Sequence, residues 1–73
     1  MSDPATTVLW RLRTPRREAS HAAILPGGPP FTLAFFVGGQ LDRIENYDTV
    51  ALALFRAADV KSTLLTEGWR EEP

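Results

Sequence analysis

A single histidine, His21, and the absence of cysteine leave this chain with few side chains suited to nucleophilic or metal chemistry. A hydrolytic site at His21 would need a serine and a carboxylate at a suitable spacing, but no nucleophile-elbow or metal-ligand motif is present. Such a histidine is more simply explained as a strand-edge residue with a partly solvated ring. We therefore assign His21 no catalytic role and expect no enzyme activity, no cofactor and no bound metal.

Two further patterns bear on ion binding. Asp42, Glu45 and Asp48 form a small acidic group, but a hard cation needs about six oxygen ligands and this segment lacks a binding loop. The glycine pairs at 27–28 and 38–39 would cradle a phosphate only in front of a helix amino terminus, and neither precedes one. We therefore interpret the acidic group as a solvated strand face and the glycines as turn residues.

Arginines are concentrated near the amino terminus, at Arg11, Arg13, Arg16 and Arg17. Their guanidinium groups suit phosphates and carboxylates, and Arg11 and Arg13 share one face of a predicted strand. Trp10 is predicted on the opposite face, so the mixture of basic and aromatic side chains used by single-strand binders is missing. Because the net charge is only −1, pairing with the chain's own glutamates is the favoured explanation. Nucleic-acid binding is the second hypothesis, and we expect no appreciable binding at about 50 mM salt.

Four segments have the alternation or composition of β-strands, at residues 7–13, 21–25, 31–37 and 40–46. A loop rich in proline and glycine, 26–30, separates the second and third. The second glycine pair predicts a tight hairpin between the third and fourth. Leu41 and Ile44 are three residues apart, so a bulge near Asp42 is needed to place both on one face of the last strand.

One amphipathic helix is predicted after these strands. Asp48, or Asn46 before it, can cap the first turn, and Gly68 supplies a left-handed stop. The apolar residues form an arc wide enough to pack on a sheet. Lys61 falls inside that arc, where its methylene chain can lie on the core while its ammonium stays in water at the sheet edge. Trp69 is expected to fold back onto the core.

The order of these elements predicts an α+β fold in a single domain, 1–73. An antiparallel sheet of three to four strands, within 7–47, is covered on one face by the C-terminal helix at 48–67. Residues 1–6 are expected to form a flexible N-terminus and residues 70–73 a tail.

Four apolar residues fall outside the face that one helix and one sheet should bury: Leu9, Phe36, Leu52 and Phe55. Single exposed apolar residues are common on monomers, but a chain of 73 residues without disulfides also gains stability by burying them in self-association. The leading hypothesis is a small, soluble, non-catalytic binding or adaptor module. It would act through protein–protein contacts, as a homodimer or with another protein.

Targeting signals give little further information. The first residues include an acid and a proline, and no apolar run reaches the length of a membrane span, so we expect a soluble protein with no membrane partner. The lack of cysteine fits a reducing cytoplasm. The pattern from Phe35 to Trp69 resembles short bacterial proteins of sheet-then-helix type, and this resemblance implies no activity.

Overall fold

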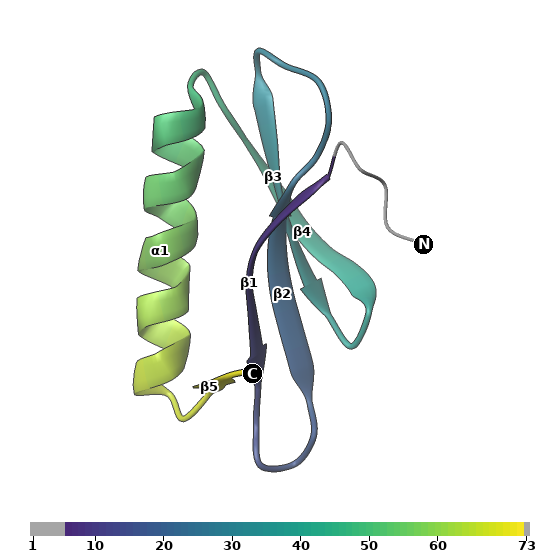
Figure 1. The fold of residues 1–73 in the computed structure, drawn as a ribbon, viewed down its shortest axis with the longest axis vertical. Helices are drawn as coiled ribbons and strands as arrows, with labels where there is room; N and C mark the ends of the chain where they lie inside the picture. The colour runs from purple at the N-terminus through teal and green to yellow at the C-terminus, as the bar shows by residue number, and fades with distance from the viewer. Residues whose placement is uncertain (1–5, 73) are drawn as a thin grey trace.

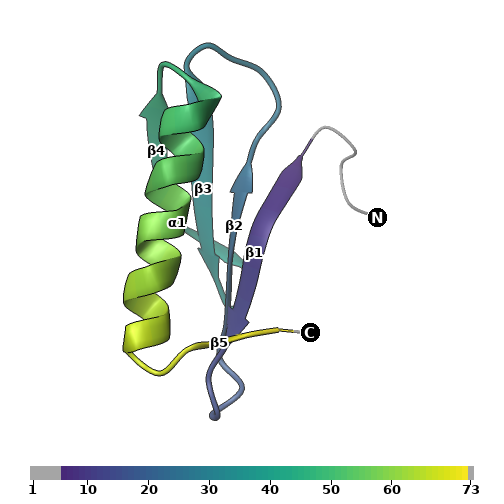
Figure 2. The same ribbon diagram turned by 60° about the vertical axis from the view of Figure 1, so that its left-hand side comes forward.

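Five strands and one helix form the part of the chain that the computed structural model describes, residues 6–72. They are β1 (Thr7–Arg13), β2 (Ala19–Ile24), β3 (Phe31–Val37), β4 (Gln40–Tyr47), α1 (Val50–Thr66) and β5 (Arg70–Glu71). The strands pair antiparallel in the order β4-β3-β2-β1-β5. In Figures 1 and 2, α1 lies along one face of this sheet, and no other described helix covers the second face. The predicted α+β fold, an antiparallel sheet followed by one helix, is confirmed.

The ends of α1 are fixed by side-chain and backbone caps. The Thr49 hydroxyl accepts a hydrogen bond from the Leu52 amide at 3.2 Å, so the cap is Thr49 and the predicted caps Asp48 and Asn46 are wrong. At the other end Gly68 has a φ of +104°, and its amide and that of Trp69 donate to carbonyls of the last turn. This is the left-handed stop predicted for Gly68. Within residues 6–72, no helix is both long and apolar enough to cross a bilayer.

The core lies between α1 and the sheet. Ala53 and Ala57 are the fully buried residues of α1, and their small side chains let the helix approach the sheet closely. The Trp10 indole N–H donates to the Ala57 carbonyl at 2.9 Å, which ties the first strand to the middle of the helix. The buried cluster consists of Trp10, Leu12, Ala22, Leu33, Phe35, Ala53 and Ala57.

A bulge in β1 changes which residues face the helix. Val8 lies opposite Ala23 of β2 and Trp10 lies opposite Ala22, so Leu9 is the extra residue between them. The alternation predicted for 7–13 would place Val8 and Trp10 on one side, and the bulge interrupts it. Val8 lies on the open face with Ala23, and Leu9 is partly buried against the core.

The β3–β4 hairpin agrees with the sequence prediction. Gly38 and Gly39 have φ of +60° and +79°, the conformation of a tight primed turn. Phe35 lies opposite Arg43 and Phe36 opposite Leu41, so Asp42 is an extra residue in β4. The bulge predicted near Asp42 is confirmed.

Two features of the predicted sheet differ from the structure. Arg70 and Glu71, expected as part of a tail, form β5 beside β1, and the Glu72 amide donates to the Arg11 carbonyl at 3.0 Å. These bonds satisfy backbone groups of β1 that would otherwise lack partners at the sheet edge. Because β2 lies between β1 and β3, His21 belongs to a central strand and not to an edge, although its side chain is partly exposed as expected. The expected flexible N-terminus lies, except for Thr6, outside the described residues.

Candidate functional site

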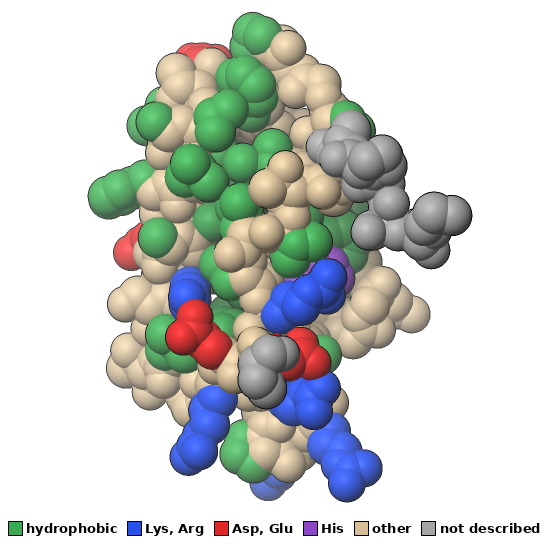
Figure 3. Space-filling model, in the orientation of Figure 1, with side chains coloured by type: hydrophobic (Ala, Val, Ile, Leu, Met, Phe, Trp, Pro, Cys, Tyr) green, Lys and Arg blue, Asp and Glu red, His purple; other side chains and the backbone are tan. Residues whose placement is uncertain are grey.

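The outer side of α1 carries apolar side chains that the sheet does not cover. Phe55 is 77% exposed and Leu52 is 51% exposed. Ala51 and Ala58, about one turn before and after Phe55, are also exposed. Hydrophobic side chains accordingly stand out along the helix at the left of Figure 3.

Phe55 is therefore a large side chain within a row of small ones. The spacing of four, three and four residues places Ala51, Phe55, Ala58 and Ser62 along one side of the helix, and we call this row the α1 stripe. None of its members is charged. It lies on the side of α1 opposite the buried Ala53 and Ala57.

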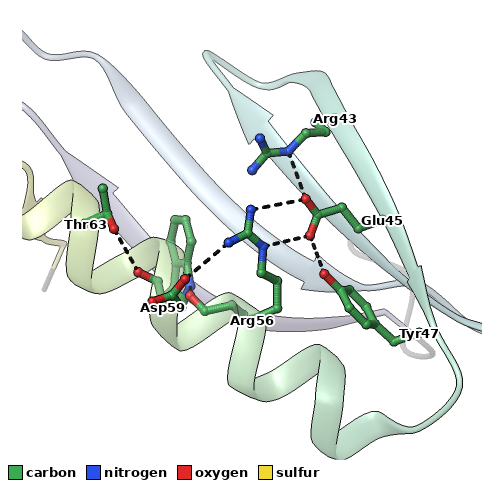
Figure 4. Close-up of polar contacts among 8 residues, drawn as sticks. Arg43, Glu45, Tyr47, Arg56, Asp59 and Thr63 are labelled. Atoms are coloured by element: carbon green, nitrogen blue, oxygen red, sulfur yellow. Dashed lines mark hydrogen bonds and ion pairs between the residues drawn. The ribbon is translucent and has the colours of Figure 1, made fainter.

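A polar cluster joins α1 to β4 next to this surface, as Figure 4 shows. The Arg56 Nε donates to Glu45 Oε1 at 3.0 Å, and the Tyr47 hydroxyl donates to the same oxygen at 2.7 Å. Arg43 Nε lies 3.4 Å from Glu45 Oε2, and a second guanidinium nitrogen of Arg56 donates to Asp59 at 3.2 Å. The cluster holds the charged groups of this region in contact with one another.

Glu45 is the centre of that cluster. Hydrogen bonds from Arg56 and then Tyr47 lower the pKa of Glu45 below its ordinary value of 4.5, because they favour the ionised carboxylate. The hydrogen bond to Glu45 in turn raises the pKa of Tyr47. An ionised carboxylate whose two oxygens already accept from Arg56 and Tyr47 is a poor general base. The arrangement is suited to anchoring α1 on the sheet.

The open face of the sheet, opposite α1, has two neighbouring rows of side chains. The first row, which we call the open-face row, runs across four strands through Arg11, His21, Phe36 and Leu41. The second runs through Val8, Ala23, Ala34 and Ile44. Leu41 is 58% exposed and Ile44 is 51% exposed, so the β4 end of this face is apolar and open to solvent.

His21 packs against an aromatic side chain in the open-face row. Its imidazole and the Phe36 ring are stacked, with centroids 4.4 Å apart and an interplanar angle of 6°. Burial, and then the positive charge of Arg11, lower the pKa of His21 below its ordinary value of 6.5. Both effects favour the neutral imidazole. The inference from the sequence that no aromatic side chain shares a face with the arginines is wrong.

The four arginines of the predicted patch lie at one end of the sheet. Arg11 and Arg13 share the open face of β1, and Arg16 and Arg17 are exposed in the following turn. Arg13 pairs with Glu72 at 2.6 Å, so part of the expected pairing with glutamates is observed. The sequence did not indicate that Arg70, through β5, lies opposite Arg13.

The four predicted interface residues do not form one surface. Leu52 and Phe55 lie on the outer side of α1, whereas Phe36 lies on the open sheet face and Leu9 at the β1 bulge. Lys61 forms an ion pair with Glu71 at the sheet edge, and Trp69 packs against the core, as expected for both. A single contact with one partner therefore involves either the helix pair or the sheet residues.

The cavities of the described residues are small or shallow. One of about 140 Å³ lies between the sheet and the end of α1 and is lined in part by Trp10, Phe35 and Trp69. It is below the roughly 300–1,000 Å³ of a typical small-molecule site. Two larger hollows, of about 400 and 450 Å³, both border Thr14 and Pro15 and are open to solvent. Within residues 6–72, no group of three or more histidine, aspartate or glutamate side chains is placed to hold a metal ion.

Comparisons with protein-family models, with curated proteins and with solved structures found no significant match. The structure itself offers two candidate surfaces. One is the α1 stripe with Leu52 beside it, and the other is the open sheet face with its arginines.

Proposed function

We propose that this chain is a small protein-binding module that self-associates through the outer side of α1. The observation that carries the proposal is the 77% exposure of Phe55 on a helix whose first turns are nearly all apolar. From Val50 to Ala58 the only charged residue is Arg56, which is engaged by Glu45. A helix that is apolar on all sides is usually buried on all sides, which requires a second layer over α1.

The α1 stripe has the shape expected of a contact between identical subunits. A two-fold axis relates equivalent patches, so a surface that associates with its own copy must be complementary to itself. Two antiparallel copies of α1 crossing near Phe55 place each Phe55 ring over Ala58 of the partner subunit. The same register places Ala51 opposite Ser62 of the partner subunit. Each large side chain then meets small ones, as in knobs-into-holes packing.

The distribution of charge around the α1 stripe also favours a second copy of the chain as the partner. The stripe itself carries no charged side chain, and the nearest charges, Arg56 and Asp59, are paired with each other at 3.2 Å. The main cost of burying a polar helix face is the desolvation of unpaired charges. Bringing two copies together at the stripe would desolvate none.

Sedimentation velocity on matched variants tests this proposal. At micromolar concentration the sedimenting species of the wild-type chain should have twice the chain mass of 8.1 kDa. Phe55→Glu should sediment as a monomer, because each copy would then bury a carboxylate against an apolar stripe. Leu41→Glu is the control, since it makes the same type of change at a residue 58% exposed on the open sheet face.

The two variants separate the possible outcomes. A dimer that survives Leu41→Glu and is lost in Phe55→Glu supports the helix contact. A wild-type chain that remains monomeric up to millimolar concentration would refute self-association. Loss of the dimer in Leu41→Glu alone would move the contact to the open sheet face and refute the helix as the interface.

A further inference from the structure

We propose that the open sheet face binds single-stranded nucleic acid, with bases against the open-face row and phosphates on the arginines around it. This surface lies on the other side of the sheet from α1, so its use does not depend on the helix contact. The observation that carries the inference is that basic and aromatic side chains come together across β1, β2 and β3.

The open-face row places a guanidinium, an imidazole and a phenyl group next to one another in that order. Arg11 of β1 lies opposite His21 of β2, and His21 lies opposite Phe36 of β3. Single-strand binders combine aromatic rings, on which bases of any sequence stack, with arginines that contact the backbone. Antiparallel sheets that carry aromatic side chains on a face can bind two or three bases in this way.

The two rings stack face to face on each other and form the apolar centre of this row. His21 and Phe36 are parallel within 6°, and neither is fully buried. Beyond Phe36 the row continues to Leu41, which is 58% exposed and extends the apolar surface to the edge of the sheet. The row thus offers bases an apolar surface that begins beside a guanidinium group.

Positive charge is concentrated at one end of this face. The end of the sheet near the β1–β2 turn holds five arginines, and Figure 3 shows basic side chains gathered over the lower part of the molecule. Within residues 6–72, these arginines take part in one ion pair, Arg13 with Glu72. The five are Arg11, Arg13, Arg16, Arg17 and Arg70.

Two of these arginines are held side by side by the backbone. Arg13 and Arg70 are cross-strand partners in the β1–β5 pair. Like charges directly opposite each other destabilise a strand pair unless an anion lies between or beside them. Glu72 supplies one carboxylate at this position, and a phosphate of a bound strand would supply further negative charge.

Acidic residues cancel only part of this charge locally, because Glu18 lies in the β1–β2 turn and Glu72 pairs with Arg13. Glu71 is paired with Lys61 of α1, on the helix side of the sheet. Glu45, Asp42 and Asp59 belong to β4 and α1, and β2 and β3 separate β4 from β1. The near-neutral total charge therefore does not describe the arginine end of the open face, where local charge decides binding.

Fluorescence anisotropy with a labelled 12-nucleotide DNA of mixed sequence tests the proposal. At about 50 mM salt the dissociation constant should lie in the range of roughly 1–100 µM, typical of backbone-dominated contacts. A duplex of the same sequence should bind more weakly, because its bases are not available for stacking. The RNA of the same sequence should bind about as well as the DNA, since stacking does not depend on the sugar.

Three variants assign the residues that bind. The double variant Arg11→Gln, Arg13→Gln should weaken binding. The slope of the logarithm of the affinity against the logarithm of the salt concentration should become smaller by about 0.7 for each phosphate that the variant no longer neutralises. Phe36→Leu keeps an apolar side chain but removes the ring, and should weaken binding by about fivefold or more. Arg43→Gln is the control, because it removes one positive charge on the helix side of β4, where Arg43 lies over the Phe35 ring. Circular dichroism on each variant establishes that it is folded.

Every outcome decides for or against the proposal. Binding that falls in the first two variants and is unchanged in Arg43→Gln supports it. No binding at about 50 mM salt, a condition that favours phosphate contacts, would overturn it. An equal loss in Arg43→Gln would show attraction by general charge alone. Unchanged binding in Phe36→Leu, with full competition by inorganic polyphosphate, would show a phosphate surface without base contacts. A change of oligomeric state in Phe36→Leu would show that a second copy occupies this face.

Discussion

Replacing Trp10 with phenylalanine should destabilise the fold by about 2 kcal/mol. The indole N–H of Trp10 donates to the Ala57 carbonyl at 2.9 Å, and the side chain is only 7% exposed. Loss of the hydrogen bond costs about 1 kcal/mol. Loss of the smaller ring of the indole removes roughly 40 Å² of buried apolar surface, about 1 kcal/mol at 25 cal/mol per Å².

The matched variant is Trp69→Phe. Trp69 packs against the same core but is only partly buried, so the same exchange should cost less than about 1 kcal/mol. Urea unfolding followed by circular dichroism measures both. For a chain of this size the slope is about 1 kcal/mol per molar urea, so Trp10→Phe should lower the midpoint by about 2 M. Protein concentration must be equal in all samples, because association stabilises the folded state.

The comparison between the two tryptophans can refute this reasoning. If Trp10→Phe costs no more than Trp69→Phe, the hydrogen bond to the helix contributes nothing to stability. The connection between β1 and α1 would then rest on apolar packing alone.

Local interactions lead to three other predictions. Because the pKa of Glu45 is lower in the folded chain, its ion pairs stabilise the fold above pH 4.5 and are lost as the pH falls through the folded pKa. In Glu45→Gln the free energy of unfolding should therefore decrease less steeply as the pH is lowered. Arg11→Gln should raise the pKa of His21 toward 6.5, since one of the two causes that lower it is removed, and an NMR titration of the imidazole that shows no rise would contradict the assigned role of Arg11. Gly39→Ala should cost about 1 kcal/mol in urea unfolding because alanine is strained at a φ of +79°, and an unchanged midpoint would show that the turn can adopt another conformation.

Local features of this fold could be predicted from the sequence. The hairpin at Gly38-Gly39, the bulge at Asp42 and the helix stop at Gly68 each depend on a few adjacent residues. Glycine is needed where φ is positive, and the spacing of Leu41 and Ile44 requires one extra residue in the strand. The periodicity of α1 predicted the inward position of Ala53 and Ala57, but Leu54, Ala58 and Leu65, which belong to the same predicted arc, are exposed.

Features that depend on pairing between distant segments could not be predicted. The β1 bulge at Leu9 places Val8 on the open face, and nothing in the alternation of 7–13 indicated it. β5 is two residues long and forms only because the β1 edge is available. The register of β1, β2 and β3 brings Arg11, His21 and Phe36 into one row, so the shared face of arginine and aromatic side chains was missed.

The central claim, that two copies associate through α1, is tested most directly by an isotope-filtered NMR experiment. A sample that mixes ¹³C-labelled and unlabelled chains reports only contacts between different copies. We expect contacts between the Phe55 ring and the methyl group of Ala58, because the antiparallel crossing places these two residues of the α1 stripe together. Contacts between copies at Leu41 and Ile44, or none at a concentration where the mass has doubled, would contradict the account.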